Sequence, residues 1–478
     1  MAIENRIGKV KNTKKGFLMD FSKEEIAEAI LNASRNLGGL AKNIDADSVY
    51  VRFRNDTEET IAQALTEDVI LCLNMQRGFR FPHLPPTLEE IHDVVIDVLQ
   101  DRGFGSVSAA YSIYREGKNA IHKGWLKKDL FVGNGYPKES MEKRQKWAME
   151  NALTSIDQIN ARIKEGKFLE MVHCDSIRYE KELKHAVSLF ERKSKKKGLR
   201  VMIIAGPSSS GKTTTSRKLC SYLREKGHEF KLLAVDNYFF SKQEYPKDWF
   251  GDMDYELPES IDLNKLNEDL KSLIEGKVIY PPHYDFERGI RTETKEPFQL
   301  KGKEILLLDC LHGLYPPTTS SIDDEIKFKV YIETHPNLII ENDTRVKFTD
   351  IRLLRRMCRD VRERGYSVQY TLEHWATVRK GEFKGIMPFQ KTSDVMINGS
   401  VIHELPCLKY YLMHNCNSPF DQKVLESYKQ KGRMDVYRRG CRAKKLLEKI
   451  EEPKKEDFEA IPVDNLIREF IGGQKLQD

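Results

Sequence analysis

The residues best suited to chemistry lie at positions 206–213, which read Gly-Pro-Ser-Ser-Ser-Gly-Lys-Thr. This is a complete G-x-x-x-x-G-K-[ST] pattern, in which a curled backbone presents N–H groups to phosphate oxygens. In such a loop Lys212 reaches the β- and γ-phosphates, and the hydroxyl of Thr213 ligates Mg²⁺. The pattern predicts a nucleoside triphosphate site. The residues expected to contact the nucleotide are Gly206, Ser208, Ser209, Ser210, Gly211, Lys212, Thr213 and Thr214.

The elements on either side of this loop agree with the motif. Residues 201–205 are an apolar run typical of a buried parallel strand. Residues 214–226 can form a helix with one apolar face, and Gly227 is placed to end it. Because strand, loop and helix occur in the order that a phosphate loop requires, a chance Gly/Ser-rich turn is the weaker interpretation.

Two carboxylates follow apolar strands, where ligands bind at the carboxyl ends of a parallel sheet. Asp236 comes after the strand 231–235, and we expect it to accept a proton from an attacking hydroxyl. Asp309 ends the strand 305–309, and we expect it to hold Mg²⁺ or its water shell together with Thr213. The alternative for each is an Asp that caps the following helix or turn.

A stripe of arginines follows further along the chain. Residues Arg352, Arg355, Arg356 and Arg359 recur at helical spacing, so they share one helix face. A solvated face normally mixes its charge signs more than this one does. The stripe predicts a lid that closes over the triphosphate and stabilises charge on the transferring phosphoryl group. Gly365 serves either as the hinge of that lid or as a helix C-cap.

The pattern of elements divides the chain into four segments. We expect an α-rich unit over residues 1–120, a charged helical connector over 121–198, and a helical extension over 416–478. Residues 199–415 alternate strands, at 201–205, 231–235, 305–309 and 328–332, with helices. That alternation predicts an α/β fold with a doubly wound parallel sheet that carries the phosphate loop.

Composition excludes several classes of protein. The formal net charge of +6 is small for a chain with 79 basic and 73 acidic residues, and its basic runs lack the interleaved aromatic residues of a nucleic-acid site. No apolar run is long enough to span a membrane, and the N-terminus lacks a signal-peptide core. The eight cysteines form no C-x-x-C pair, which suits reduced thiols. We therefore expect a cytoplasmic protein that binds neither nucleic acid nor membrane.

Taken together and in order, these motifs resemble the uridine kinase/phosphoribulokinase family of phosphate-loop kinases, and within it the bacterial uridine kinase-like nucleoside kinases. The matching segments are 206–213, 236–239, 281–289, 305–309, 352–360 and the terminal 461–473. The resemblance implies phosphorylation of a nucleoside 5′-hydroxyl by ATP with Mg²⁺. It also implies that Asp236 is the catalytic base and that Arg352 and Arg355 are lid arginines that reach the phosphates.

The acceptor side departs from the family pattern. The resemblance places Glu256, Tyr284, Asp285 and Arg288 around the acceptor. Uridine kinases show Phe-Asp-His-Pro where this chain reads Tyr-Glu-Leu-Pro over 255–258, so the carboxylate that faces the ribose diol is one methylene longer. A sugar or sugar-phosphate acceptor, with Arg288 and Arg291 holding a second phosphate, stays open. So does a non-catalytic nucleotide sensor, whereas a GTPase is excluded because no Asn-Lys-x-Asp segment occurs.

The N-terminal unit resembles an ATP-cone, a nucleotide-sensing domain. The matching pieces are 13–16, 26–30, 91–99 and 110–115. The resemblance implies that Lys14 and Lys15 contact the triphosphate of an ATP or dATP effector, that effector binding regulates the distant kinase domain, and that the chain forms a homo-oligomer. The alternative is a small helical domain without a ligand.

Overall fold

The computed structural model describes residues 7–12, 16–35, 37–45, 48–80, 85–131, 138–245, 256–285, 288–341, 344–417, 419–431 and 433–476. The chain divides into two compact units. Unit 1 comprises residues 1–136 together with 428–438, and unit 2 comprises residues 137–427 together with 439–478.

Unit 1 combines a β-hairpin with a group of helices. Strands β1 (Lys9–Asn12) and β2 (Phe17–Asp20) pair antiparallel, and β1 contacts α3. Helix α3 begins at the capping box of Thr87 and Glu90, and it buries Ile91, Val94, Val95, Val98 and Leu99. The helices of this unit in the first 136 residues are α1 (Lys23–Arg35), α2 (Glu58–Arg80), α3 (Leu88–Asp101) and α4 (Gly105–His122).

Unit 2 is built on a five-stranded parallel sheet with the strand order β11-β8-β3-β7-β4. Strand β3 lies at the centre, and strands that come later in the chain flank it on both sides. The carboxyl end of β3 is therefore the topological switch point, where ligands bind in open α/β sheets. The strands are β3 (Val201–Ala205), β4 (Phe230–Leu233), β7 (Ile305–Cys310), β8 (Lys327–Glu333) and β11 (Val395–Asn398).

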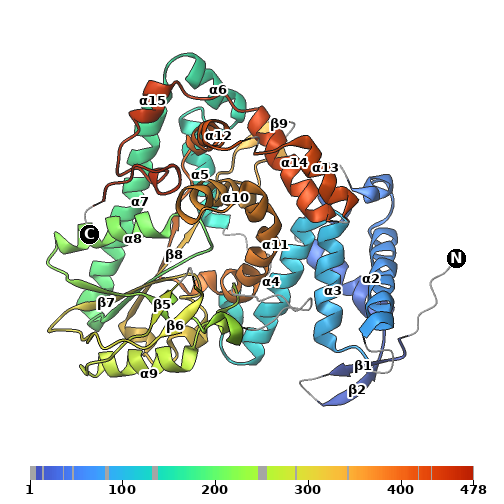
Figure 1. Ribbon diagram of the computed structural model, residues 1–478, viewed down its shortest axis with the longest axis horizontal. Helices are drawn as coiled ribbons and strands as arrows, with labels where there is room; N and C mark the ends of the chain where they lie inside the picture. Colours follow the sequence, from blue (N-terminus) through green and yellow to red (C-terminus); the bar gives the residue numbers. More distant parts are fainter. Residues whose placement is uncertain are drawn as a thin grey trace. The chain divides into compact units, whose positions relative to one another are not determined.

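Helices cover this sheet, and the helix after the phosphate loop contacts β3 and β7 (Figure 1). The helices that lie wholly in unit 2 are α5 (Lys138–Glu150), α6 (Ile156–Lys164), α7 (Phe168–Lys197), α8 (Lys212–Arg224), α9 (Leu263–Ile274), α10 (Phe348–Arg359), α11 (Val368–Gly385), α12 (Glu404–Asn415), α15 (Lys455–Glu459) and α16 (Arg468–Ile471). Helices α13 (Gln422–Gln430) and α14 (Met434–Glu448) each contain residues of both units. Small hairpins are formed by β5 (His283–Asp285) with β6 (Ile290–Thr292), and by β9 (Ile339–Glu341) with β10 (Thr344–Arg345).

The α/β fold with a parallel central sheet is confirmed, and each of the predicted strands is present within a few residues. The fifth strand, β11, is not among the predicted ones. The division into segments differs from the expected one. Helix α7 of the expected connector packs on both α8 and β11, and residues 137–198 of this segment belong to the same unit as the phosphate loop.

Within the described residues, no helix is both long and apolar enough to cross a membrane.

Candidate active site

The phosphate loop, residues 206–213, is held tightly against the neighbouring strand β8. Gly206 has φ of 157°, and a Cβ at this position would lie 2.2 Å from the carbonyl oxygen of Ile332. Ser209 adopts a left-handed backbone with φ of 59°, which is uncommon for a residue with a side chain. A glycine with no Cβ and a locally strained serine let the loop curl at the end of β3.

The loop offers donors to an anion. The hydroxyl groups of Ser209 and Ser210 are buried and have no hydrogen-bond partner among the described residues. The helix α8 begins directly after them, so its N-terminal N–H groups and dipole favour negative charge at the same place. Lys212 donates from Nζ to the carbonyl oxygen of Pro207 at 3.1 Å, and burial lowers its pKa. These residues fit a bound triphosphate.

The strand order brings the two predicted carboxylates to this loop. Strand β7 pairs with both β3 and β4, so Asp309 at the end of β7 and Asp236 after β4 lie at the same edge of the sheet as the loop. Asp236 is exposed to solvent, yet desolvation by the surrounding protein raises its pKa, and the positive charge of Lys212 opposes that rise. Asp236 is therefore a stronger proton acceptor than an ordinary surface carboxylate.

The donors for a metal ion are few. The side chain of Thr213 is exposed, and Asp309 is half-buried, with burial raising its pKa to about 6. No group of three or more His, Cys, Asp or Glu residues suited to a metal occurs in the described part of the chain. A hydroxyl and one carboxylate fit Mg²⁺, which takes its remaining oxygen ligands from phosphates and water.

Arg352 and Arg355 do not lie on an exposed lid, contrary to the prediction. Both are fully buried on α10. Arg352 pairs with Glu382 at 2.5 Å and donates to the carbonyl oxygen of Ser208 at 3.0 Å. Arg355 pairs with Glu404 at 2.5 Å and donates to the carbonyl oxygen of Ser209 at 3.3 Å. Each guanidinium has a carboxylate and a loop carbonyl to satisfy it, so these residues support the loop from behind.

The remaining arginines of the stripe are placed differently. Arg356 donates to the hydroxyl of Ser208 at 3.1 Å and pairs with Glu256 at 3.2 Å. Arg359 donates to the same hydroxyl at 3.4 Å, and within the described residues it forms no ion pair with a carboxylate. Burial and the neighbouring guanidinium groups of Arg364 and Arg356 lower the pKa of Arg359 to about 10. Arg359 is thus a cation beside the phosphate loop that no described carboxylate pairs with directly.

Arg359 and Arg364 also act electrostatically on Asp236. The positive charges of both residues oppose the rise in the pKa of Asp236. The helix containing Arg364, a π-helix over Asp360–Arg364, ends at Gly365 with φ of 66°, which identifies this glycine as a C-cap. The sequence pattern included Arg359 in the stripe, but it could not show that Arg352 and Arg355 pair with buried carboxylates whereas Arg359 does not pair with any described one.

Glu256 lies close to this arginine cluster. It is buried, and its Oε1 atom accepts from Arg356 at 3.2 Å and lies 3.5 Å from His374. Despite burial, the positive charge of Arg356 and the neighbouring His374 side chain hold the pKa of Glu256 well below the usual range, so the carboxylate is ionised. Its backbone is also constrained, because a Cβ on Gly381 would lie 2.2 Å from the carbonyl oxygen of Glu256.

The other acceptor residues lie on the β5–β6 hairpin. Tyr284 is buried, its hydroxyl is 2.6 Å from that of Tyr245, and its backbone N–H donates to the side chain of Asn237 at 3.2 Å. This bond attaches the hairpin to the residue that follows Asp236. Asp285 accepts from the backbone N–H of Arg288 at 3.0 Å and so closes the turn.

The arginines of this hairpin differ in availability. The side chain of Arg288 is 80% exposed, with its nearest carboxylate, Asp285, at 3.7 Å. Arg291 pairs with Asp262 at 3.0 Å. Only Arg288 of these two is presented largely to solvent.

The C-terminal segment completes the site, a contribution that sequence reasoning did not foresee. Glu469 on α16 accepts from both the backbone N–H of Thr214, at 3.0 Å, and its hydroxyl, at 2.6 Å. Gln474 donates to the same hydroxyl at 2.7 Å, and Leu466 packs against Gly211. The only sequence signal was that 461–473 belonged to the family resemblance.

Lys14 and Lys15, the residues expected to contact an effector, lie outside the described residues. The strands on either side of them, β1 and β2, pair antiparallel.

Residues 201–405 match the model of the Phosphoribulokinase / Uridine kinase family. The chain is similar to uridine kinases of Staphylococcus aureus, among them those of strains JH9 and Newman. Each is 29% identical over 202 residues, which cover 42% of this chain and 88% of the relative. The match begins at β3 and ends in α12, so it contains the phosphate loop, both carboxylates and the arginine helix.

Two solved structures are also similar. A putative fructose transport system kinase from Silicibacter sp. TM1040 is 14% identical with a TM-score of 0.30, and the match covers 45% of this chain and 98% of that one. A possible uridine kinase from Bacillus stearothermophilus is 22% identical with a TM-score of 0.26, and the match covers 31% of this chain and 80% of that one.

Proposed function

We propose that residues 201–405, which match the Phosphoribulokinase / Uridine kinase family, form an ATP-dependent kinase domain that phosphorylates the 5′-hydroxyl of a nucleoside. The observation that carries this proposal is the position of Asp236. It lies at the sheet edge that holds the phosphate loop and interacts electrostatically with Lys212 and Arg359. A protein that only binds nucleotide has no need for a proton acceptor there.

The chain's own groups bind and orient the triphosphate. The backbone of 206–211, the hydroxyls of Ser209 and Ser210, and the N-terminus of α8 bind phosphate oxygens. Thr213 and Asp309 would hold Mg²⁺, which neutralises charge on the phosphates when it is bound. Lys212 and Arg359 face the phosphoryl group that is transferred, and stabilise the charge on its oxygens.

Transfer then requires one proton to move. Asp236 accepts the proton of the acceptor hydroxyl as that oxygen forms a bond to the γ-phosphorus. The bond between the γ-phosphorus and the bridging oxygen of ADP breaks, and the electron pair leaves with ADP. A general base in this role contributes about 10²- to 10⁴-fold to the rate.

The acceptor side favours a nucleoside over a sugar phosphate. The ionised Glu256 is suited to accept hydrogen bonds from a diol, as the matching Asp does in the resembled family. A second substrate phosphate would need free cations, but Arg291 already pairs with Asp262. Arg288 is exposed and could contact a substrate phosphate, so a sugar or a sugar phosphate remains the alternative acceptor.

The test is ATP consumption by the purified chain, with Mg²⁺, against ribonucleosides, deoxynucleosides and pentose phosphates. Turnover with a nucleoside alone, and a product that carries a 5′-phosphate, supports the proposal. Turnover with a pentose phosphate alone moves the assignment to a sugar kinase. ATP binding without turnover on any acceptor contradicts a nucleoside kinase and favours a sensor.

We also propose that unit 1 is an ATP-cone that binds ATP or dATP through Lys14 and Lys15 and regulates the kinase through a homo-oligomer. The antiparallel pairing of β1 and β2, the two strands that precede and follow Lys14 and Lys15 in the chain, supports this. The test compares wild type with a Lys14→Ala/Lys15→Ala double variant over a range of dATP concentrations. Kinase activity and mass by light scattering should change with dATP in the wild type alone. An identical response of the two proteins contradicts the proposal.

A further inference from the structure

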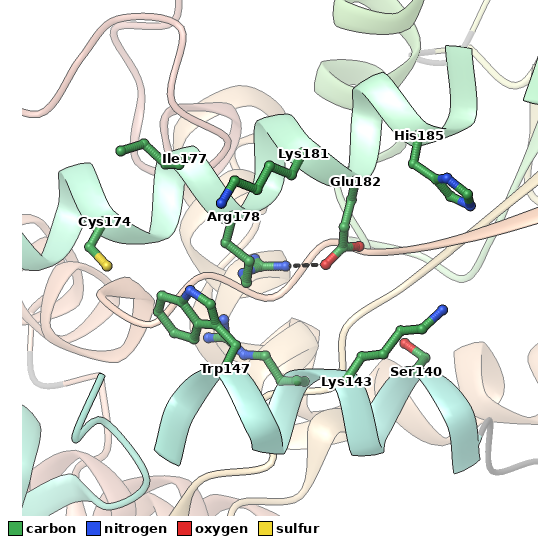
Figure 2. A pocket seen from close by; sticks show the side chains of 10 residues that line it. Ser140, Lys143, Trp147, Cys174, Ile177, Arg178, Lys181, Glu182 and His185 are labelled. Atoms are coloured by element: carbon green, nitrogen blue, oxygen red, sulfur yellow. Dashed lines mark hydrogen bonds and ion pairs between the residues drawn. The ribbon is translucent and has the colours of Figure 1, made fainter. Parts of the chain in front are cut away.

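A pocket of about 360 Å³ lies between α5 and α7, in a part of unit 2 to which the kinase reaction assigns no role. Its lining residues recur at helical spacing on the two helices, so each helix presents one face to it. Trp147 and Lys143 extend from α5, and Arg178 and Glu182 point from α7 toward them (Figure 2). The lining residues used below are Lys143, Arg144, Trp147, Arg178, Lys181 and Glu182.

Positive charge dominates the lining. Four of those six residues are cationic and one is anionic. Asp175 pairs with Arg144 at 2.8 Å and with Arg178 at 2.7 Å. Glu182 also pairs with Arg178, at 2.5 Å, and Lys143 pairs with Glu139 at 2.8 Å. Lys181 is exposed and forms no ion pair with any described residue. The pocket therefore attracts an anion.

Arg144 has hydrogen-bonding capacity that no described residue uses. The residue is 3% exposed, and its Nη1 atom donates to Asp175. Its Nε and Nη2 atoms have no hydrogen-bond partner in the described part of the chain. Burial and the positive charge of Arg178 lower the pKa of Arg144, against the opposing charge of Asp175. A guanidinium with two unused donors matches the oxygens of a phosphate group.

The pocket also has an apolar wall. The guanidinium of Arg144 lies over the indole ring of Trp147, 4.6 Å from the ring centroid. Ile177 on α7 also lines the pocket and is 45% exposed. The volume is many times the space that one water molecule occupies. We propose that the pocket between α5 and α7 binds a small metabolite that carries a phosphate group on a ring-containing body, such as a nucleoside monophosphate.

A ligand there would act on the phosphate loop through a short path. Arg178 donates to the carbonyl oxygen of Ser400 at 2.6 Å, next to Gly399. Gly399 is packed so closely on the loop that a Cβ would lie 2.5 Å from the carbonyl oxygen of Ser210. Arg355 joins the same parts, because it donates to Gly399 at 2.7 Å and to the carbonyl oxygen of Ser209 at 3.3 Å. Binding in the pocket is thereby linked to ATP binding.

The experiment is calorimetric titration of the full chain with uridine 5′-monophosphate and, separately, with inorganic phosphate. A non-hydrolysable ATP analogue and Mg²⁺ are present at saturation, so that the phosphate loop is occupied. Lys181→Glu reverses a charge at the pocket, and Lys184→Glu is the matched control, since Lys184 is exposed on the same helix outside the lining. Arg144→Lys retains a cation to pair with Asp175 but removes the unused guanidinium donors.

We expect binding in wild type and in Lys184→Glu, and at least tenfold weaker binding in Lys181→Glu and in Arg144→Lys. If the nucleotide binds more tightly than phosphate, the apolar wall contacts the ring of the ligand. If the two bind equally tightly, the site is one for free phosphate. Absence of binding in wild type overturns the proposal, and so does binding that Lys181→Glu and Arg144→Lys leave unchanged. In the absence of the analogue, the dissociation constant for ATP should change at least twofold when the pocket ligand is added; an unchanged value overturns the link to the loop.

Discussion

Replacement of Arg355 and of Arg359 by glutamine should have opposite consequences, although both lie on α10. Arg355 is fully buried and pairs with Glu404 at 2.5 Å. Removing one partner of a buried ion pair costs about 3–5 kcal/mol, because the other charge stays buried and unpaired. For a unit of this size we expect Arg355→Gln to lower the melting temperature by roughly 5–10 °C.

Arg359→Gln removes a half-buried cation that forms no ion pair with a described carboxylate and is repelled by Arg356 and Arg364. The melting temperature should therefore stay the same or rise. If Arg359 stabilises the transferring phosphoryl group, turnover should fall by about 10²- to 10³-fold, as for the loss of one donor to developing charge.

The assay combines thermal unfolding with turnover measured well below the melting temperature of each variant. Arg224→Gln, at the exposed end of α8, is the control and should change neither quantity. Arg355→Gln with an unchanged melting temperature, or Arg359→Gln with full turnover, would refute the division of the stripe into supporting and phosphate-facing arginines.

Three further perturbations follow from the structure. Asp236→Asn should lower kcat by about 10²- to 10⁴-fold with little change in ATP affinity measured by calorimetry, and retained turnover would exclude a base at this position. Gly399→Ala should weaken ATP binding, because its Cβ would lie 2.5 Å from the carbonyl oxygen of Ser210, whereas Gly105→Ala, with nothing within 4 Å, should leave binding unchanged. Burial lowers the pKa of His403 from 6.5 to about 4, so the unfolded chain binds more protons between these values and stability is lost as the pH falls from 6.5 toward 4. The free energy of unfolding should fall by about 3 kcal/mol from this group between pH 7 and pH 4, and urea unfolding curves at these two pH values measure the loss. His403→Gln should abolish this part of the pH dependence. A variant with the same pH dependence as wild type would contradict this role of His403.

Much of the catalytic edge could be predicted because its signals are local. The phosphate loop is one contiguous motif, and Asp236 and Asp309 each follow an apolar run that ends where a parallel strand would end. Strand order then brings them together, since β7 pairs with both β3 and β4. The role of each carboxylate in the reaction stays a prediction.

The arginine stripe shows where such reasoning ends. Helical spacing places Arg352, Arg355 and Arg359 on one face, but it does not say what lies opposite that face. The carboxylates that bury Arg352 and Arg355 lie 30 and 49 residues further along the chain. The assignment of both residues to a lid followed from the family resemblance and from treating the stripe as uniform.

The sequence alone determined the phosphate loop, the parallel α/β class and the positions of the carboxylates, because each depends on residues adjacent in the chain or on a short periodic pattern. Tertiary structure decided which charges are neutralised. It brought Glu469 into hydrogen-bonding contact with Thr214, 255 residues away in the sequence. It left Arg359 without a carboxylate partner among the described residues, and it packed α5 and α7 around a basic pocket. The physical reason is that the free energy of a buried charge depends on the groups packed against it, and these come from distant segments that no local pattern identifies.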